Sequence, residues 1–183
     1  MRTLLRLIVA TAIAVLPARL EAQPATVILV RHAEKASQTE SDPVLSEAGV
    51  QRAKDLAAAL ADAGIGSVIT TQFQRTRLTA ADVVAATKLT PIVVNAAGAS
   101  HPADVAAAIR ARPAGEVVLV VGHSNTITPI IAALGGPKLA NICDSQYSNL
   151  YILQMQDASA PKLIRANFGK ADPADPACTN TMR

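Results

Sequence analysis

The chain has 183 residues, enough for one domain with a sizeable core. Half of the residues are hydrophobic, but only 2% are aromatic and none is Trp, so the core must be aliphatic. Charged residues make up 17% of the chain, which argues against wholesale disorder. The net charge of +3 raises the question of nucleic-acid binding, and the positions of the charges decide it.

Residues 1–22 have the pattern of a secretory signal peptide. Two arginines stand near the start, Leu7–Leu16 is an apolar stretch, Pro17 ends any helix, and Ala22 offers a small residue for cleavage. The apolar stretch is well short of the ~20 residues needed to cross a bilayer. We therefore expect export to the periplasm or the medium, with no membrane association after cleavage.

Cleavage changes the charge balance. Without residues 1–22 the chain keeps 14 basic and 13 acidic residues, a net charge of +1. The basic excess thus belongs mostly to the targeting segment, and nucleic acid is not an expected partner.

The mature chain is expected to be a single domain, residues 23–183, with a tail from about residue 170 that is rich in Pro and Asp. It retains Cys143 and Cys178, and in an exported protein such a pair favours a disulfide. A bridge would hold the tail against the body and contribute roughly 3–4 kcal/mol. Two free thiols are the alternative.

Apolar runs alternate with helical patterns along the rest of the chain. Strands are expected at 26–30, 67–70, 92–94, 117–121, 150–153 and 163–166. Helices are expected after Ser46 up to Gly64, at 75–86, at 103–110, and from Ser124 or Asn125 to Leu134. This alternation predicts an α/β fold, a three-layer α/β/α sandwich with a mostly parallel central sheet.

The first of these helices has the clearest start signal. Ser46 is expected to be its N-cap, with Leu45 and Val50 placed as a hydrophobic staple. Val50 also opens the apolar stripe that continues through Leu56 and Leu60.

Polar clusters follow three of the predicted strands. Arg31-His32 follows the first, the segment 70–77 follows the second, and His123 follows the strand 117–121. The carboxyl ends of parallel strands meet at one rim of the sheet, where ligands bind in this class of fold. Guanidinium groups there would bind phosphate oxygens and an imidazole would act as a nucleophile, so the pattern favours a phosphoryl group.

Four segments in chain order resemble the histidine phosphatase superfamily, the phosphoglycerate-mutase-like proteins. Together they span roughly residues 26–134. They are Arg31-His32-Ala33-Glu34, the helix start Leu45–Gly49 with Arg52-Ala53, the segment Thr71–Ala80 (TQFQRTRLTA), and Gly122–Thr126 (GHSNT).

The resemblance implies a metal-independent phosphomonoester hydrolase that needs no cofactor. His32 would be the nucleophile and form a phosphohistidine, while Arg31, Arg75 and His123 would bind the phosphate. The expected partner is a small phosphorylated substrate or a phosphoprotein. A mutase reaction is less expected than hydrolysis, because the chain has little room for insertions that would shield the phosphoenzyme from water.

The general acid is the weakest part of the match. Asp104, near His101 in the segment SHPAD, is the best-placed carboxylate, with a helix N-terminal role as its alternative. Glu34 is the second candidate.

Other functions fit the same residues less well. A serine hydrolase fails because no His follows Ser124 in the chain. A zinc hydrolase using His32, His101 and His123 leaves the arginines unexplained. A phospho-ligand-binding domain without catalysis stays open. With four aromatic residues in all, a pocket built on aromatic stacking is not expected.

Overall fold

A computed structural model of the chain describes residues 26–157 and 159–178. Within them, strands and helices follow one another in the predicted order. The strands are β1 (Thr26–Arg31), β2 (Ile65–Thr70), β3 (Ile92–Val93), β4 (Val117–Gly122), β5 (Asn149–Gln154) and β6 (Lys162–Asn167). The helices are α1 (Glu47–Ala59), α2 (Gln74–Thr87), α3 (His101–Arg110) and α4 (Ile127–Ala133). The predicted signal peptide lies outside the described residues.

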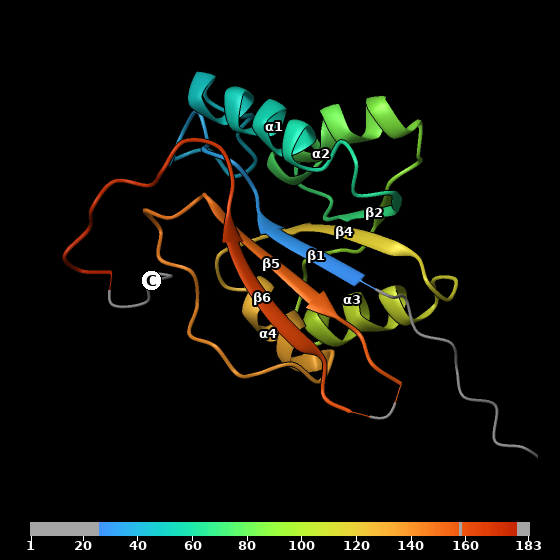
Figure 1. Ribbon diagram of the computed structural model, residues 1–183. Coiled ribbons are helices and arrows are strands. Elements are labelled where there is room, and N and C mark those ends of the chain that lie inside the picture. Colours follow the sequence, from blue (N-terminus) through green and yellow to red (C-terminus); the bar gives the residue numbers. More distant parts are fainter. Residues whose placement is uncertain (1–25, 158, 179–183) are drawn as a thin grey trace, which may run out of the picture.

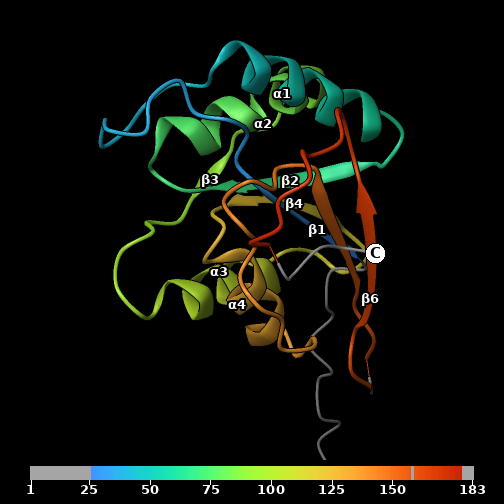
Figure 2. The same ribbon diagram turned by 90° about the vertical axis from the view of Figure 1, so that its left-hand side faces the viewer.

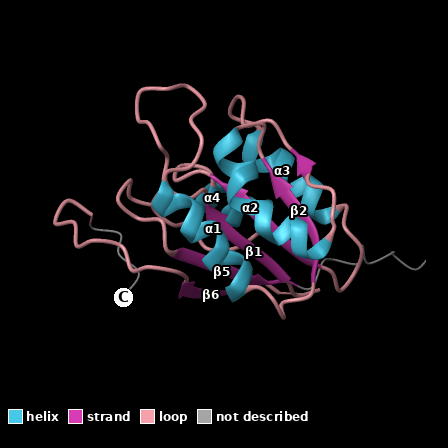
Figure 3. Cartoon of the chain, turned by 90° about the horizontal axis from the view of Figure 1, so that it is seen from above, coloured by secondary structure: helices cyan, strands magenta, loops and turns pink. Residues whose placement is uncertain are grey.

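The described strands form one sheet in the order β3-β2-β4-β1-β5-β6. The first four in this order are parallel, β5 runs antiparallel to β1, and β6 runs antiparallel to β5 (Figures 1 and 3). The sheet is therefore mostly parallel, as predicted. Because β4 lies between β1 and β2, the carboxyl ends of these three strands are neighbours.

Helices cover both faces of the sheet. Figures 1 and 2 show α1 and α2 on one face and α3 and α4 on the other. Successive residues of β1 alternate between the two cores: Val27 and Leu29 belong to the α3/α4 side, and Ile28 and Val30 to the α1/α2 side. Both cores are almost wholly aliphatic, as the composition requires.

Helix α1 begins as predicted, and most of its predicted stripe is buried. The Ser46 hydroxyl accepts a hydrogen bond from the Gly49 N–H at 3.1 Å, so Ser46 is its N-cap. The stripe is confirmed at Leu56 and Leu60, which are buried. It is wrong at Val50, the expected staple partner of Leu45, which is 45% exposed. Arg52 on this helix is also buried, and its guanidinium pairs with Glu34.

Helix α4 begins later than predicted. Residues 124–126 form a turn, and the helix starts at Ile127. The reason is local: the Thr126 hydroxyl accepts a hydrogen bond from the His123 N–H at 2.9 Å, which closes the turn before the helix begins. Ser124 is therefore not the cap of this helix.

The chain after β6 passes the amino end of β5, which lies beside the carboxyl end of β1. Cys178 forms a disulfide with Cys143 in the loop between α4 and β5, as favoured from the sequence. We call residues 143–147 the arginine loop and residues 169–178 the tail. No helix among the described residues is long and apolar enough to cross a membrane.

Candidate active site

The two histidines that follow strand ends lie side by side. The His32 N–H donates to the Gly122 carbonyl at 2.8 Å, which continues the β1–β4 pairing by one residue. This brings the His32 and His123 rings to a centroid distance of 5.4 Å. The expected convergence at one rim is therefore found.

The hydrogen bond of His32 determines which of its nitrogens is free. Its Nδ1 lies 2.8 Å from the Ala33 carbonyl oxygen, which can only accept, so Nδ1 carries the proton. Burial lowers the pKa of His32 to about 3, and the positive charges of Arg31 and Arg75 contribute to the lowering. The ring is therefore neutral at pH 7, and the lone pair of Nε2 is available as a nucleophile.

His123 is held in a similar way. Its Nε2 lies 3.2 Å from the hydroxyl of Thr71, the residue after β2. That hydroxyl also lies 3.0 Å from the hydroxyl of Thr76. Burial lowers the pKa of His123 to about 3, and nearby His32 and Arg75 add to the effect. An anion between the histidines would favour protonation of His123, because it would offset those positive charges.

Arg31 is almost completely buried, with 4% of its surface exposed. Its Nη1 donates to three carbonyl oxygens of the arginine loop, and its guanidinium lies 4.0 Å from the ring centre of Tyr147. Its Nε is buried without a hydrogen-bond partner among the described residues. An unpaired buried donor on a cation is a strong site for an anion oxygen.

Arg75, the second residue of α2, lies near both histidines, since its charge lowers the pKa of each. Its guanidinium lies 4.1 Å from the ring centre of Phe73, and its Nη1 is 3.7 Å from a carboxylate oxygen of Asp42. Burial lowers the pKa of Arg75, and Asp42 opposes that effect. Arg77, two residues further along the helix, is exposed.

Two of the four aromatic residues therefore stand in this site, which corrects the expectation from composition. The Tyr147 ring lies 6.3 Å from the His32 ring, and the Phe73 ring lies 5.5 Å from the His123 ring. Each aromatic ring also stacks on one of the two arginines. Because Phe73 stands two residues before Arg75 in the chain, its place in the site could have been predicted from the sequence. Tyr147 reaches the site only through the course of the arginine loop.

The two carboxylates considered as acids occupy different surroundings. Both oxygens of Glu34 accept from the Arg52 guanidinium at 2.8 to 3.0 Å. Asp104 is exposed in the first turn of α3, three residues after His101, whose positive form would lower the pKa of His123. The Glu34 carboxylate is thus held by Arg52, whereas Asp104 is exposed to solvent.

Sequence reasoning did not consider Asp42 or Asp144 at the site. The Asp144 carboxylate lies 3.5 Å from Arg31 Nη2 and 3.4 Å from the Ser124 hydroxyl. Both carboxylates flank an arginine at the edge of the site, and both come from loops without a motif.

The residues described do not form a metal centre. No group of three His, Cys, Asp or Glu side chains within residues 26–157 and 159–178 could hold an ion. His101 donates from Nδ1 to the Asn95 carbonyl, and its buried Nε2 has no partner in the described part of the chain. The triad of His32, His101 and His123 thus gives the zinc hypothesis no support.

The two histidine rings lie side by side, and the charges of Arg31 and Arg75 lower the pKa of both. Guanidinium groups beside neutral imidazoles are suited to bind a tetrahedral dianion. The model of the histidine phosphatase superfamily (branch 1) matches residues 27–97, which include Arg31, His32 and Arg75. Over these residues the chain is similar to that family.

Solved structures of histidine phosphatases share its fold. The protein histidine phosphatase SixA in complex with tungstate has a TM-score of 0.61 at 18% identity, covering 78% of this chain and 96% of that one. SixA from Agrobacterium tumefaciens gives 0.58 at 23% identity, covering 80% and 99%. Mycobacterial glucosyl-3-phosphoglycerate phosphatase gives 0.57 at 18% identity, covering 79% and 98%. No curated protein matches the chain significantly.

Proposed function

We propose that this protein is a histidine phosphatase that hydrolyses phosphomonoesters through a phosphohistidine on His32, without a metal ion. His32 Nε2 attacks phosphorus while the ester P–O bond breaks, and the bonding electron pair leaves with the alcohol oxygen. Water then attacks the phosphohistidine, the N–P bond breaks, and orthophosphate is released. The observation that carries this proposal is the 2.8 Å hydrogen bond from His32 Nδ1 to the Ala33 carbonyl, which leaves Nε2 unprotonated.

The arginines and His123 would stabilise the charge of the transferring phosphoryl group. Arg31 Nε and the Arg75 guanidinium are donors near the histidine pair. They need no reorganisation, because Tyr147 and Phe73 already hold them. Asp104 is proposed to donate a proton to the oxygen of the leaving alcohol. Glu34 is proposed to hold Arg52 rather than to act as the acid.

The proposal includes the location and the substrate class. Residues 1–22 would direct export, and the disulfide would then form in an oxidising compartment. The mature domain, residues 23–183, would act on a small phosphorylated substrate or a phosphoprotein. The size of the mature product, measured after expression in a bacterial host, tests the export step.

The test of the chemistry is a rapid-quench experiment with 32P-labelled substrates from a panel of phosphomonoesters. We expect about one acid-labile phosphate per wild-type chain and none on His32→Ala. Turnover should persist in the presence of a chelator. Arg75→Gln should lose most activity, and its matched control Arg77→Gln, on the exposed side of the same helix, should keep it. Phosphate binding without turnover in the wild type would support the non-catalytic alternative.

A further inference from the structure

We propose that the tail positions Arg31 for phosphate binding, with Asp172 as the positioning residue and the Cys143–Cys178 disulfide as its anchor. This inference rests on the proposed function, because it concerns the arginine that would bind the phosphate. It goes beyond that function because the activity would then depend on the tail, which lies outside the four segments that resemble the family.

The orientation of Arg31 is set by backbone carbonyls rather than by acidic side chains. Its Nη1 donates to the carbonyl oxygens of three residues in the arginine loop, at 2.9 to 3.0 Å: Cys143, Asp144 and Gln146. Its carboxylate neighbour among the described residues, Asp144, is 94% exposed and 3.5 Å away. The direction of Arg31 Nε therefore depends on where the loop backbone lies.

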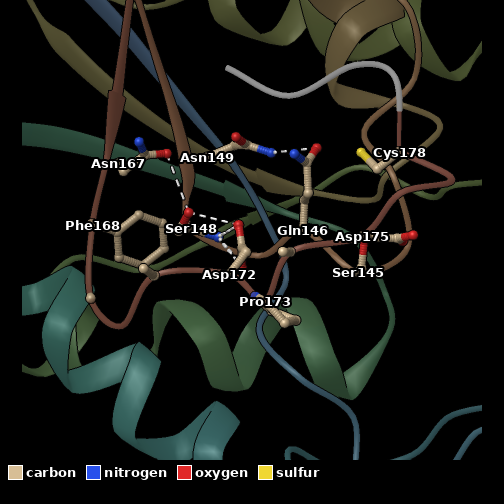
Figure 4. Close-up of a pocket in the computed structure, with 13 residues that line it drawn as sticks. Ser145, Gln146, Ser148, Asn149, Asn167, Phe168, Asp172, Pro173, Asp175 and Cys178 are labelled. Atoms are coloured by element: carbon tan, nitrogen blue, oxygen red, sulfur yellow. Dashed lines mark hydrogen bonds between the residues drawn. The ribbon is translucent and has the colours of Figure 1, made fainter. Parts of the chain in front are cut away.

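The arginine loop borders a cavity rather than a packed core. Ser145, Gln146 and Ser148 line this cavity of about 380 Å³, whose other walls come largely from the tail (Figure 4). A loop beside a polar cavity is not fixed by close packing, so specific bonds must hold it in place.

Asp172 holds the end of the arginine loop and the residue that follows it. Its carboxylate accepts from the Tyr147 N–H at 2.8 Å. It also accepts from the Ser148 N–H at 3.1 Å and from the Ser148 hydroxyl at 2.7 Å (Figure 4). The side chain is only 12% exposed, which strengthens these charge-assisted bonds. They fix the backbone at the end of the arginine loop, next to the ring that stacks on Arg31.

The tail makes two further connections to the same loop. The Ser145 hydroxyl donates to the Asp175 carboxylate at 2.7 Å. The disulfide joins Cys143, whose carbonyl accepts from Arg31, to Cys178. The loop is thus tied to the tail near its beginning, its middle and its end.

Asp172 also reaches the other side of the site. One of its oxygens lies 3.9 Å from Arg52 Nη2, and the same nitrogen donates to Glu34 at 2.8 Å. Glu34 follows the nucleophile by two residues. One buried carboxylate of the tail therefore connects the arginine loop with the strand end that carries Arg31 and His32.

The consequence is a dependence of phosphate affinity on the tail. Loss of the tethers lets the loop carbonyls move, and Arg31 then loses the alignment of its phosphate-binding donors. Misalignment of Arg31 should weaken phosphate binding and also the stabilisation of the transferring phosphoryl group. The tautomer of His32, which is fixed by Ala33, should not change.

Two variants test this dependence on the tail: Asp172→Asn and the double variant Cys143→Ser/Cys178→Ser. The matched control is Asp157→Asn, in the exposed connection between β5 and β6. The asparagine side chain keeps the shape of the carboxylate but replaces one acceptor by a donor. We expect KM and the inhibition constant of orthophosphate to rise about ten-fold in both variants, and kcat to fall as well, because Arg31 also stabilises the transferring phosphoryl group. The control should match the wild type. Reduction of the wild type with dithiothreitol should reproduce the effect of the serine variant.

A double-mutant cycle separates positioning from general stability. In an Arg31→Lys background, Asp172→Asn should cause no further rise in KM, because the aligned guanidinium is already gone. A purely structural role would lower the melting temperature and the activity equally in both backgrounds. That result, or an unchanged KM in Asp172→Asn and in the serine variant, would overturn the proposal.

A readout without turnover keeps the two proposals distinguishable. The chain has no Trp and two Tyr, so Tyr147 is the sole fluorophore of this kind in Tyr151→Phe. Its anisotropy should fall on reduction or in Asp172→Asn, and a constant value counts against the tail proposal. A wild-type protein that neither hydrolyses phosphomonoesters nor binds orthophosphate refutes the phosphatase assignment instead.

Discussion

The Nδ1 atom of His32 donates a hydrogen bond to the carbonyl oxygen of the next residue, Ala33, at 2.8 Å. This contact fixes both the tautomer and the rotation of the ring. Together with burial, it provides a neutral nucleophile in a site that otherwise holds two permanent positive charges. The protein does not need a carboxylate partner to orient this histidine, because its own backbone does so.

The low pKa values of His32 and His123, both about 3, predict that acid destabilises the fold. Between pH 6.5 and 3 the unfolded state binds protons at these histidines and the folded state does not. The free energy of unfolding should therefore fall as the pH falls, by about 1 kcal/mol per pH unit for each histidine.

Urea denaturation between pH 7 and pH 5, where carboxylates are still ionised, measures this slope. His32→Asn and His123→Asn should each remove about half of the histidine contribution. The same pKa values predict that kcat/KM shows no inflection near pH 6.5 from His32. An NMR titration in which a histidine signal absent from His32→Asn shifts near pH 6.5 would contradict the assignment of a neutral buried ring.

The site residues that could be predicted from the sequence are those that stand at the ends of strands. Arg31, His32 and His123 directly follow apolar runs that were recognisable as buried parallel strands, and Arg75 starts a predicted helix. In a parallel sheet such positions must converge, so their neighbourhood followed from local patterns alone.

The residues that hold these groups in place could not be predicted in the same way. Tyr147 and Asp172 lie in irregular segments, and their partners are more than twenty residues away or on other strands. The burial of Arg52 on α1 could not be predicted for a related reason. Periodicity counts Arg52 as a surface residue, and its distant partners, Glu34 and the carbonyls of Phe168 and Lys170, make its burial favourable.

The buried pair of Arg52 and Glu34 predicts a large effect on stability. Arg52 also donates to the carbonyls of Phe168 and Lys170, so Arg52→Leu leaves a carboxylate and two carbonyls without their donor. We expect a loss of about 3 kcal/mol in the free energy of unfolding. Urea denaturation measures it, and the exposed control Arg77→Leu should stay within about 0.5 kcal/mol of the wild type.

The stacking of Tyr147 on Arg31 predicts a difference between two substitutions at one position. Tyr147→Phe keeps the ring face against the guanidinium, so phosphate affinity should stay close to that of the wild type. Tyr147→Leu removes the cation–π contact, worth about 0.5–1 kcal/mol, so the inhibition constant of orthophosphate should rise about two- to five-fold. Equal effects of the two substitutions would assign the role to the hydroxyl instead.

The proposed proton donor predicts a dependence on the leaving group. Alkyl phosphates leave as poorly stabilised alkoxides and need a proton, whereas p-nitrophenyl phosphate does not. Asp104→Asn should therefore lower kcat for alkyl phosphates by about 100-fold and change kcat for p-nitrophenyl phosphate little. Glu34→Gln should affect the two substrates equally, because both Glu34 oxygens are held by Arg52. If Asp104→Asn lowers kcat equally for the two substrates, Asp104 acts only as a charge at the N-terminus of α3. A loss for alkyl phosphates alone in Glu34→Gln would assign the role of proton donor to Glu34.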